Sequence, residues 1–324
     1  MTEGMTDGMT NLPDAAMMNA LAPHGPEATQ VATLTQVMTV GGALILLLVC
    51  VLTAVAILGP RSWKRALSGR DTVRWGGFAF PIVTLAALLF WSLWTMRGTE
   101  RAAAAPAALT ISVVGEQWWW RLDYRDAQGR RFAEANEIVV PVGVDVDLLL
   151  ESADVIHSVW LPSLAGKLDM IPGRTNRLRL RADRPGVYRG QCAEYCGGSH
   201  ARMGFELIAL APDDFAAWRA AAHAPRREPA DEDARRGREV FAAAGCGACH
   251  TVRGTDAQGR VGPDLTRLGA RRHIAAASLP NTHDARARFV ARSQEVKPQS
   301  LMPPFAFLTE TQLSDLAAYL GGLK

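Results

Sequence analysis

The chain has 324 residues, of which 48% are hydrophobic, and its formal net charge at pH 7 is +3. This length is too great for one domain, and the apolar residues are concentrated near the N-terminus. The sequence has no apparent internal repeat, glycine-rich phosphate loop or nucleophile–base pairing. These absences argue against a hydrolytic enzyme.

Residues 1–30 are expected to form an N-terminal tail, because they lack the basic region of a cleaved signal peptide. Methionines recur in the tail up to Met18, which is one indication of copper scavenging. A disordered tail or a misassigned start codon is the alternative that we favour. His24 in this tail is interpreted as a surface residue.

Two apolar runs follow the tail, at residues 37–58 and 78–96, and neither contains a charged residue. Each is long enough to cross a hydrocarbon core of about 30 Å as a helix. We therefore predict a transmembrane hairpin over residues 31–97, with a buried soluble hairpin as the alternative. The connecting loop carries one acid, Asp71, and five basic residues, which are Arg61, Lys64, Arg65, Arg70 and Arg74. The positive-inside rule then predicts a cytoplasmic loop, with both termini outside.

Residues 107–212 show the alternation of half-buried strands. Apolar residues recur at Leu109, Ile111 and Val113, and the run from Arg177 to Arg181 alternates throughout. Runs of this kind, bounded by glycine and proline, predict an all-β antiparallel sandwich. Three successive tryptophans, residues 118–120, are typical of a membrane interface or of a sandwich core.

The segment 192–203, which reads CAEYCGGSHARM, is expected to join two of these strands and to bind metal. It contains Cys192, Cys196, His200 and Met203, and His157 lies upstream. Soft sulfur ligands favour copper, and two thiolates four residues apart can bridge two copper ions. A Cys192–Cys196 disulfide and a tetrahedral zinc site are the alternatives. Neither explains why Met203 and His157 complete the set.

Residues 213–232 are predicted to form a short helix and a charged linker, with a boundary near Pro229. Such a tether raises the effective concentration of the following domain near the copper loop. That last domain carries thirteen Lys and Arg against seven Asp and Glu from Arg235 onward. A basic rim of this kind steers acidic partners. Its histidines His273 and His283, like His223 in the linker, are interpreted as surface residues.

The last domain, residues 233–324, contains CGACH at 246–250, the attachment sequence of a c-type haem. Cys246 and Cys249 would form the thioether bonds, and His250 would be an axial ligand. A CxxC motif alone would indicate a redox disulfide or half of a zinc site. The adjacent histidine and the lack of a second cysteine pair argue against both.

The sixth haem ligand is predicted to be Met302, because a Met/His pair raises the potential of a haem. A methionine is more often core filler, but Met302 is the only methionine after Met203. A helix close to the C-terminus is predicted from a capping box formed by Thr309 and Gln312. Gly321 would end that helix.

The motifs DVIHSVW, GQCAEYCGGSHARM, GEQWWWRLDY and KLDMIPGRTN resemble subunit II of haem-copper cytochrome c oxidases, from the first apolar run to about Leu210. The last domain resembles class I cytochromes c, which are all-α. The resemblance implies a multidomain protein with a two-helix transmembrane hairpin, a cupredoxin-like sandwich and a cytochrome c domain, as in caa-type oxidases.

By this resemblance, a binuclear CuA centre is held by the side chains of His157, Cys192, Cys196, His200 and Met203. Glu194 would contribute its backbone carbonyl, and its carboxylate would bind a magnesium ion shared with subunit I. From the residues alone, Glu194 is equally a solvated loop acid.

The resemblance also has implications for two positions that are not metal ligands. In the family, the tryptophan at the position of Trp118 takes electrons from the donor cytochrome. A glutamate that feeds protons towards subunit I in many members is replaced here by Arg74, which argues against proton uptake through this subunit.

The function implied is electron delivery in the bacterial inner membrane. Electrons would pass from a donor cytochrome c or cytochrome bc complex through haem c and CuA to subunit I, where oxygen is reduced. Subunit III is a further expected partner, and nucleic acid is not. A CuA-type nitric oxide reductase subunit and a membrane-anchored copper-delivery or assembly protein are the alternatives.

Overall fold

The computed structural model describes residues 17–104, 106–125, 129–224, 228–229 and 231–324. Most of the predicted tail and part of the predicted linker lie outside this range. The chain forms two compact units: residues 29–106 make one, and residues 107–324 together with the residues up to Ala28 make the other. The predicted multidomain class, with two apolar helices, a β-sandwich and a helical C-terminal domain, is confirmed.

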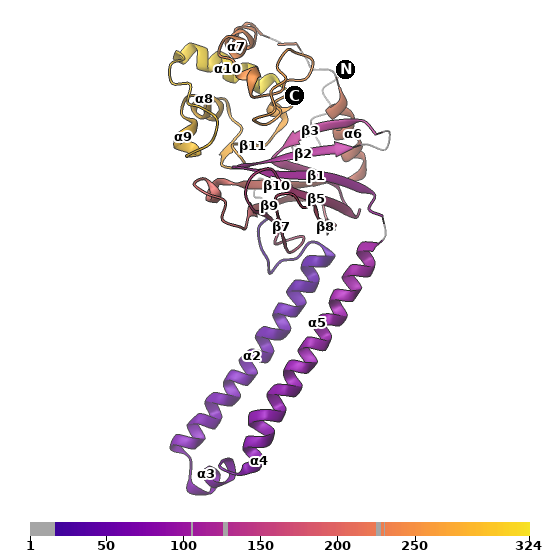
Figure 1. Ribbon diagram of the computed structural model, residues 1–324, viewed down its shortest axis with the longest axis vertical. Helices are drawn as coiled ribbons and strands as arrows, with labels where there is room; N and C mark the ends of the chain where they lie inside the picture. Colours follow the sequence, from indigo (N-terminus) through magenta and orange to yellow (C-terminus); the bar gives the residue numbers. More distant parts are fainter. Residues whose placement is uncertain (1–16, 105, 126–128, 225–227, 230) are drawn as a thin grey trace. The chain divides into compact units, whose positions relative to one another are not determined.

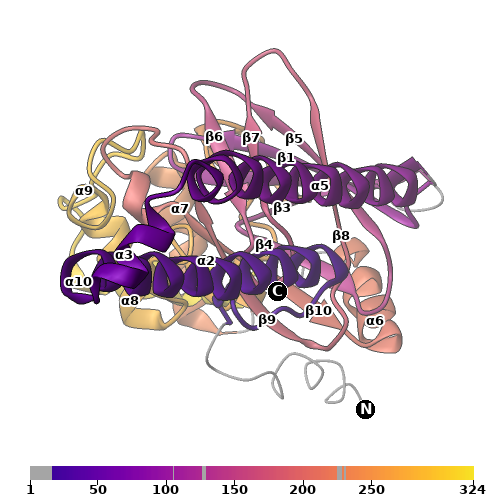
Figure 2. The ribbon, with the colours of Figure 1, turned by 90° about the horizontal axis from the view of Figure 1, so that it is seen from below.

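The first unit consists of two long helices and the turns between them. Helix α2 (Pro26–Leu58) is followed by α3 (Arg61–Leu67), α4 (Arg70–Thr72) and a π-helical stretch η1 (Val73–Ala79), and the chain returns in α5 (Phe80–Ala104) (Figures 1 and 2). Two spans, Pro26–Leu58 and Arg70–Arg97, are long and apolar enough to cross a membrane. The helices extend beyond the predicted apolar runs, because polar residues at their ends continue the helical hydrogen bonding that the runs begin.

The sandwich contains two sheets of five strands each, in the orders β3-β2-β1-β5-β8 and β4-β10-β9-β6-β7. The strands are β1 (Leu109–Glu116), β2 (Trp119–Arg125), β3 (Arg131–Ala135), β4 (Glu137–Pro141), β5 (Val146–Ser152), β6 (His157–Trp160), β7 (Lys167–Met170), β8 (Asn176–Leu180), β9 (Gly186–Cys192) and β10 (Gly204–Leu210). The prediction of a wholly antiparallel sandwich is wrong in one respect, since β1 pairs with β5, and β4 with β10, in parallel. Alternation reveals strands but not which strands become neighbours.

The sandwich core and the residues around it explain several features of the sequence. Trp120 is buried in the core, where its ring meets that of Phe205 edge-on at 5.0 Å between centroids. The end of the predicted tail is part of this unit, because the backbone N–H of Met17 donates to the carbonyl of Val187. His24 is half-buried, with its ring 5.7 Å from that of Tyr188, and so differs from the predicted surface residue.

The helical region begins with α6 (Pro212–His223), where the predicted short helix is confirmed, and continues with α7 (Glu232–Ala243). It then contains η3 (Cys246–Ala248), η4 (Leu268–Ala270), β11 (His273–Ile274), β12 (Leu279–Pro280), α8 (His283–Ala291), α9 (Ser293–Val296) and α10 (Glu310–Gly322). The short helix η2 (His200–Arg202) lies earlier, between β9 and β10 of the sandwich. The capping box of Thr309 and Gln312 is confirmed. Gly321 lies inside α10 rather than after it, and its missing side chain leaves room for the guanidinium of Arg286.

Candidate copper and haem sites

The loop between β9 and β10 brings the predicted sulfur ligands together. The Sγ atoms of Cys192 and Cys196 lie 3.8 Å apart, and Cys196 Sγ is 3.8 Å from Met203 Sδ and 3.4 Å from His200 Nδ1. His157 reaches the same cluster from β6, with its Nδ1 3.9 Å from Cys192 Sγ. Because a disulfide bond is about 2.05 Å long, the two sulfurs are not joined.

The two thiols shift each other's pKa in opposite directions. A hydrogen bond from Cys196 lowers the pKa of Cys192, assisted by a hydrogen bond with His157 and opposed by burial. The same contact with Cys192 raises the pKa of Cys196, and burial adds to this rise. The two sulfurs lie beside an imidazole and a thioether. This soft, buried donor set fits copper.

The imidazole of His157 is held in place by its neighbours. Its Nε2 lies 2.8 Å from Asp154 Oδ1, so a proton on Nε2 leaves Nδ1 free to face the sulfurs. A Cβ on Gly115 would lie 2.7 Å from His157 Cδ2, so the glycine makes room for the ring. Asp154 was not identified from the sequence, where it resembles an ordinary turn residue.

Glu194 directs its two polar groups differently. Its backbone carbonyl accepts a hydrogen bond from Cys192 Sγ at 3.3 Å, within the sulfur cluster. Its carboxylate is exposed and lies 3.8 Å from Lys167 Nζ. The carbonyl is therefore available to a metal in the cluster, and the carboxylate to a group outside it.

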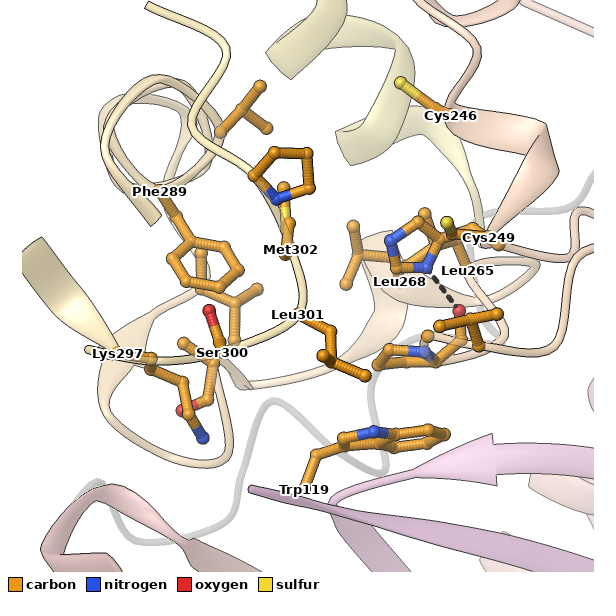
Figure 3. Close-up of a pocket in the computed structure, with 18 of the residues that line it drawn as sticks. Trp119, Cys246, Cys249, Leu265, Leu268, Phe289, Lys297, Ser300, Leu301 and Met302 are labelled. Atoms are coloured by element: carbon orange, nitrogen blue, oxygen red, sulfur yellow. Dashed lines mark hydrogen bonds between the residues drawn. The ribbon is translucent and has the colours of Figure 1, made fainter. Parts of the chain in front are cut away.

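The CGACH motif borders a cavity of about 700 Å³ in the C-terminal region. Figure 3 shows Cys246, Cys249 and Met302 around this cavity, with Leu265, Leu268 and Phe289 among its apolar lining. His250 Nδ1 donates to the carbonyl of Pro263 at 2.8 Å, which leaves Nε2 available to a ligand. Burial lowers the pKa of His250 and so favours the neutral, ligating form.

A glycine beside His250 leaves room for the imidazole ring. A Cβ on Gly262 would lie 2.5 Å from His250 Cε1, so this glycine keeps the imidazole unobstructed. Two free cysteines, a neutral imidazole and a thioether line one apolar space, and this set fits a covalently attached haem.

Two of the three successive tryptophans also border this cavity. Trp118 is 5% exposed, and its Nε1 donates to the carbonyl of Cys196 at 2.9 Å. Trp118 thus joins the backbone of the copper loop to the lining of the cavity. Trp119 also lines the cavity (Figure 3), and the guanidinium of Arg121 lies over its ring at 5.1 Å from the centroid. The row of tryptophans indicated this region, but the role of Trp119 as a cavity wall was missed.

The sandwich and the C-terminal region are also joined by buried ion pairs. Glu134 on β3 contacts Arg267 Nη1 at 2.9 Å and Arg271 Nη2 at 3.3 Å. Glu206 on β10 contacts His273 Nδ1 at 3.2 Å and Arg272 Nε at 3.5 Å. Arginines counted towards a basic rim therefore face the sandwich.

These contacts correct two predictions. His273 is not a simple surface histidine, since it lies at this ion-paired surface, and His223 packs its ring against Phe132 at 4.9 Å. His283 is exposed, as predicted. The last domain contacts the sandwich directly as well as being tethered to it.

Glu137 on β4 completes the surface. Its Oε1 accepts from the backbone N–H of Arg272 at 2.7 Å and of His273 at 3.0 Å. Burial raises the pKa of Glu137 to about 7, and the neighbouring carboxylate of Glu206 adds to the rise while the N–H groups oppose it.

Fold and sites together define a class of membrane-anchored redox proteins in which a cupredoxin-like domain precedes a cytochrome c domain. Residues 123–209 match the family model of the cytochrome c oxidase subunit II periplasmic domain, and residues 234–324 match that of cytochrome c. The chain belongs to the cytochrome c oxidase subunit II family, with a fused cytochrome c domain. These families imply CuA copper and haem.

The chain is similar to individual cytochrome c oxidase subunits 2 and to a solved subunit II domain. Cytochrome c oxidase subunit 2 of Alkalihalophilus pseudofirmus is 40% identical over 214 residues, which cover 66% of this chain and 61% of the relative. That of Bacillus sp. (strain PS3) is 33% identical, over 67% of this chain and 62% of the relative. The crystal structure of the periplasmic domain of subunit II of cytochrome oxidase (CoxB) of Bradyrhizobium japonicum is 35% identical, over 36% of this chain and 95% of that structure, with a TM-score of 0.35. The chain thus spans less than two thirds of the length of these curated relatives.

Proposed function

We propose that this chain is the electron-input subunit of a respiratory haem-copper cytochrome c oxidase. It would take electrons from a donor cytochrome c or a cytochrome bc complex and deliver them, by way of haem c and CuA, to subunit I, which reduces oxygen to water. The position of Trp118 carries this proposal, because one side chain borders the haem cavity and hydrogen-bonds the copper loop.

The ligand roles follow from the donor sets. Cys246 and Cys249 would attach haem c covalently, with His250 and Met302 as axial ligands. Copper would be held by the side chains of the loop, by His157 and by the Glu194 carbonyl; the loop ligands are Cys192, Cys196, His200 and Met203. When bound, these groups supply one-electron redox chemistry.

The chain itself orients ligands and excludes water. Asp154 fixes the His157 ring, Pro263 fixes the His250 ring, and Cys192, Cys196 and Met203 are almost fully buried. A rigid, dry setting limits the rearrangement that accompanies a change in charge. Trp118 would receive electrons from the donor side, a role supported by its contacts with both sites.

The partners follow from this assignment. Subunit I, and with it subunit III, would contact the anchored chain, and the exposed Glu194 carboxylate would share a magnesium ion with subunit I. The two apolar helices support anchoring in the bacterial inner membrane, with the cupredoxin-like and cytochrome domains on the outer side. The proton-translocating activity would belong to the complex.

The test is turnover of the purified complex on oxygen and on nitric oxide with reduced cytochrome c as donor. We expect oxygen uptake that is lost when subunit II is absent. Fast nitric oxide reduction with negligible oxygen uptake would overturn the proposal in favour of a nitric oxide reductase. A copper loop that does not change redox state in the haem-loaded chain would instead indicate copper delivery.

A further inference from the structure

Lys297 is a lysine buried between the two sites. It is 4% exposed and lies at the end of α9, in the segment that leads to Met302 (Figure 3). Its Nζ donates to the backbone carbonyls of Trp118, of Arg202 at 2.9 Å and of Ala275 at 3.5 Å. One ammonium group therefore joins the haem-ligand segment to Trp118 and to the residue before the copper ligand Met203.

Side chains of the copper loop also donate hydrogen bonds to the segment that contains Lys297. Arg202 Nη1 donates to the carbonyls of Glu295, at 2.8 Å, and Val296. Ser199 Oγ donates to the carbonyl of Pro298 at 2.7 Å. We name this set, Lys297 with Arg202 and Ser199, the clasp. It binds the loop that carries the copper ligands to the segment that carries the axial methionine.

Burying the ammonium group of Lys297 costs free energy that a purely structural contact would not require. A buried ammonium must be hydrogen-bonded to offset its lost hydration, and burial lowers the pKa of Lys297 to about 7, an effect that the nearby Cys196 opposes. An apolar side chain of similar length would fill the same space without that cost. An apolar side chain cannot form directional hydrogen bonds. The three carbonyls around the Lys297 nitrogen, in contrast, fix the relative positions of three backbone segments.

We propose that Lys297 is a positioning residue for electron transfer between the haem and the copper centre, holding Met302, Trp118 and the copper loop at a fixed separation. This inference rests on the proposed electron-transfer function. Lys297 acts through its hydrogen bonds to the backbone carbonyls of Trp118 and Arg202.

The experiment compares Lys297→Met with Arg292→Met in the intact, haem- and copper-loaded protein. Arg292 lies in the same segment with its side chain 65% exposed and 3.8 Å from the Glu295 carboxylate, so its substitution removes a charge and leaves the donors and carbonyl acceptors of the clasp in place. After photoreduction of the haem, the rate of electron transfer to copper is followed optically. Hydrogen exchange of residues 197–204 and 295–299 is measured in parallel.

In Lys297→Met we expect intramolecular transfer to slow relative to the wild type, because electron transfer weakens with the separation that the clasp fixes. Exchange in both segments should rise, while haem reduction by an external donor and both cofactor spectra stay unchanged. Arg292→Met should match the wild type in every measurement. If Lys297 had only a structural role, its substitution would not slow transfer from haem to copper while leaving haem reduction by an external donor unchanged.

Wild-type transfer in Lys297→Met would overturn the positioning role and leave the proposed function intact. If the fully loaded wild-type protein shows no transfer between haem and copper, the proposed function itself fails. Should Lys297→Met fail to load its cofactors, Arg202→Gln removes the reciprocal half of the clasp, and the same two rates decide.

Discussion

Replacing Glu134 with glutamine tests whether the cytochrome domain is fixed to the sandwich by buried charge. Glu134 is 5% exposed, and it faces Arg267 and Arg271, which are almost equally buried. The substitution removes the negative charge of Glu134 from these two guanidinium groups and keeps an acceptor oxygen in nearly the same place. The change therefore isolates charge from shape.

The expected cost follows from the geometry of the pairs. Removing one partner of a buried ion pair costs about 3–5 kcal/mol, because the remaining charge stays buried. Arg271 keeps its bond to the carbonyl of Asp264, and Arg267 keeps its contact with the Trp218 ring, so the lower end applies. A loss of about 3 kcal/mol corresponds to a roughly 150-fold increase in the separated form of the two domains.

Native-state hydrogen exchange of residues 267–273 in the loaded protein measures this separation. Glu232→Gln is the matched control, because Glu232 pairs with Arg235 at 2.8 Å on the surface with its side chain 65% exposed. A surface pair contributes about 0–1 kcal/mol, so the control should exchange almost as the wild type does. Equal exchange in Glu134→Gln and Glu232→Gln would refute the argument from buried charge.

Three further outcomes are expected. Cys196→Ser should abolish the mixed-valence binuclear copper spectrum and leave haem attachment intact, because only one bridging sulfur remains; absorption and spin-resonance spectra measure this. Glu137 has a folded-state pKa raised from 4.5 to about 7, so the stability linked to its protonation is fully present below pH 4.5 and is lost as the pH rises through 7. Glu137→Gln should remove that slope, worth up to about 3 kcal/mol, in unfolding measured between pH 5 and 8. Gly262→Ala should displace the His250 ring and perturb the low-spin haem spectrum, whereas Gly322→Ala, where an added Cβ meets nothing within 4 Å, should not.

Each of these expectations has a contrary result. A binuclear spectrum that survives in Cys196→Ser would exclude bridging by this thiol. An unchanged pH slope in Glu137→Gln would mean that another group is responsible for it. A normal haem spectrum in Gly262→Ala would show that His250 can occupy a second position.

The sequence predicted features that are encoded locally. Apolar runs without charges indicated the two long helices, and alternation indicated the strands that flank the copper loop. The thiols of residues 192–203 and the CGACH motif are close in sequence, so their chemistry could be read before any tertiary structure was known. His157 and Met302 needed support from family resemblance, because each joins its cluster from a distant segment.

The surface between the domains could not be predicted in this way. Glu137 and Glu206 are charged residues that the sequence does not mark as buried, and the structure places them against Arg272 and His273. Lys297 stands among polar residues and looks like an exposed lysine. Its acceptors are backbone carbonyls, which leave no trace in residue identity.

That choice of acceptors affects how the protein can vary between species. Since every amino acid supplies a carbonyl, replacing the side chain of Ala275 leaves that acceptor of Lys297 in place. Among the three acceptors, position 275 should therefore tolerate substitution best, whereas Lys297 is constrained as the donor, and Trp118 and Arg202 are constrained by what their own side chains bind. A comparison of orthologues would then find an invariant lysine facing a variable residue at position 275.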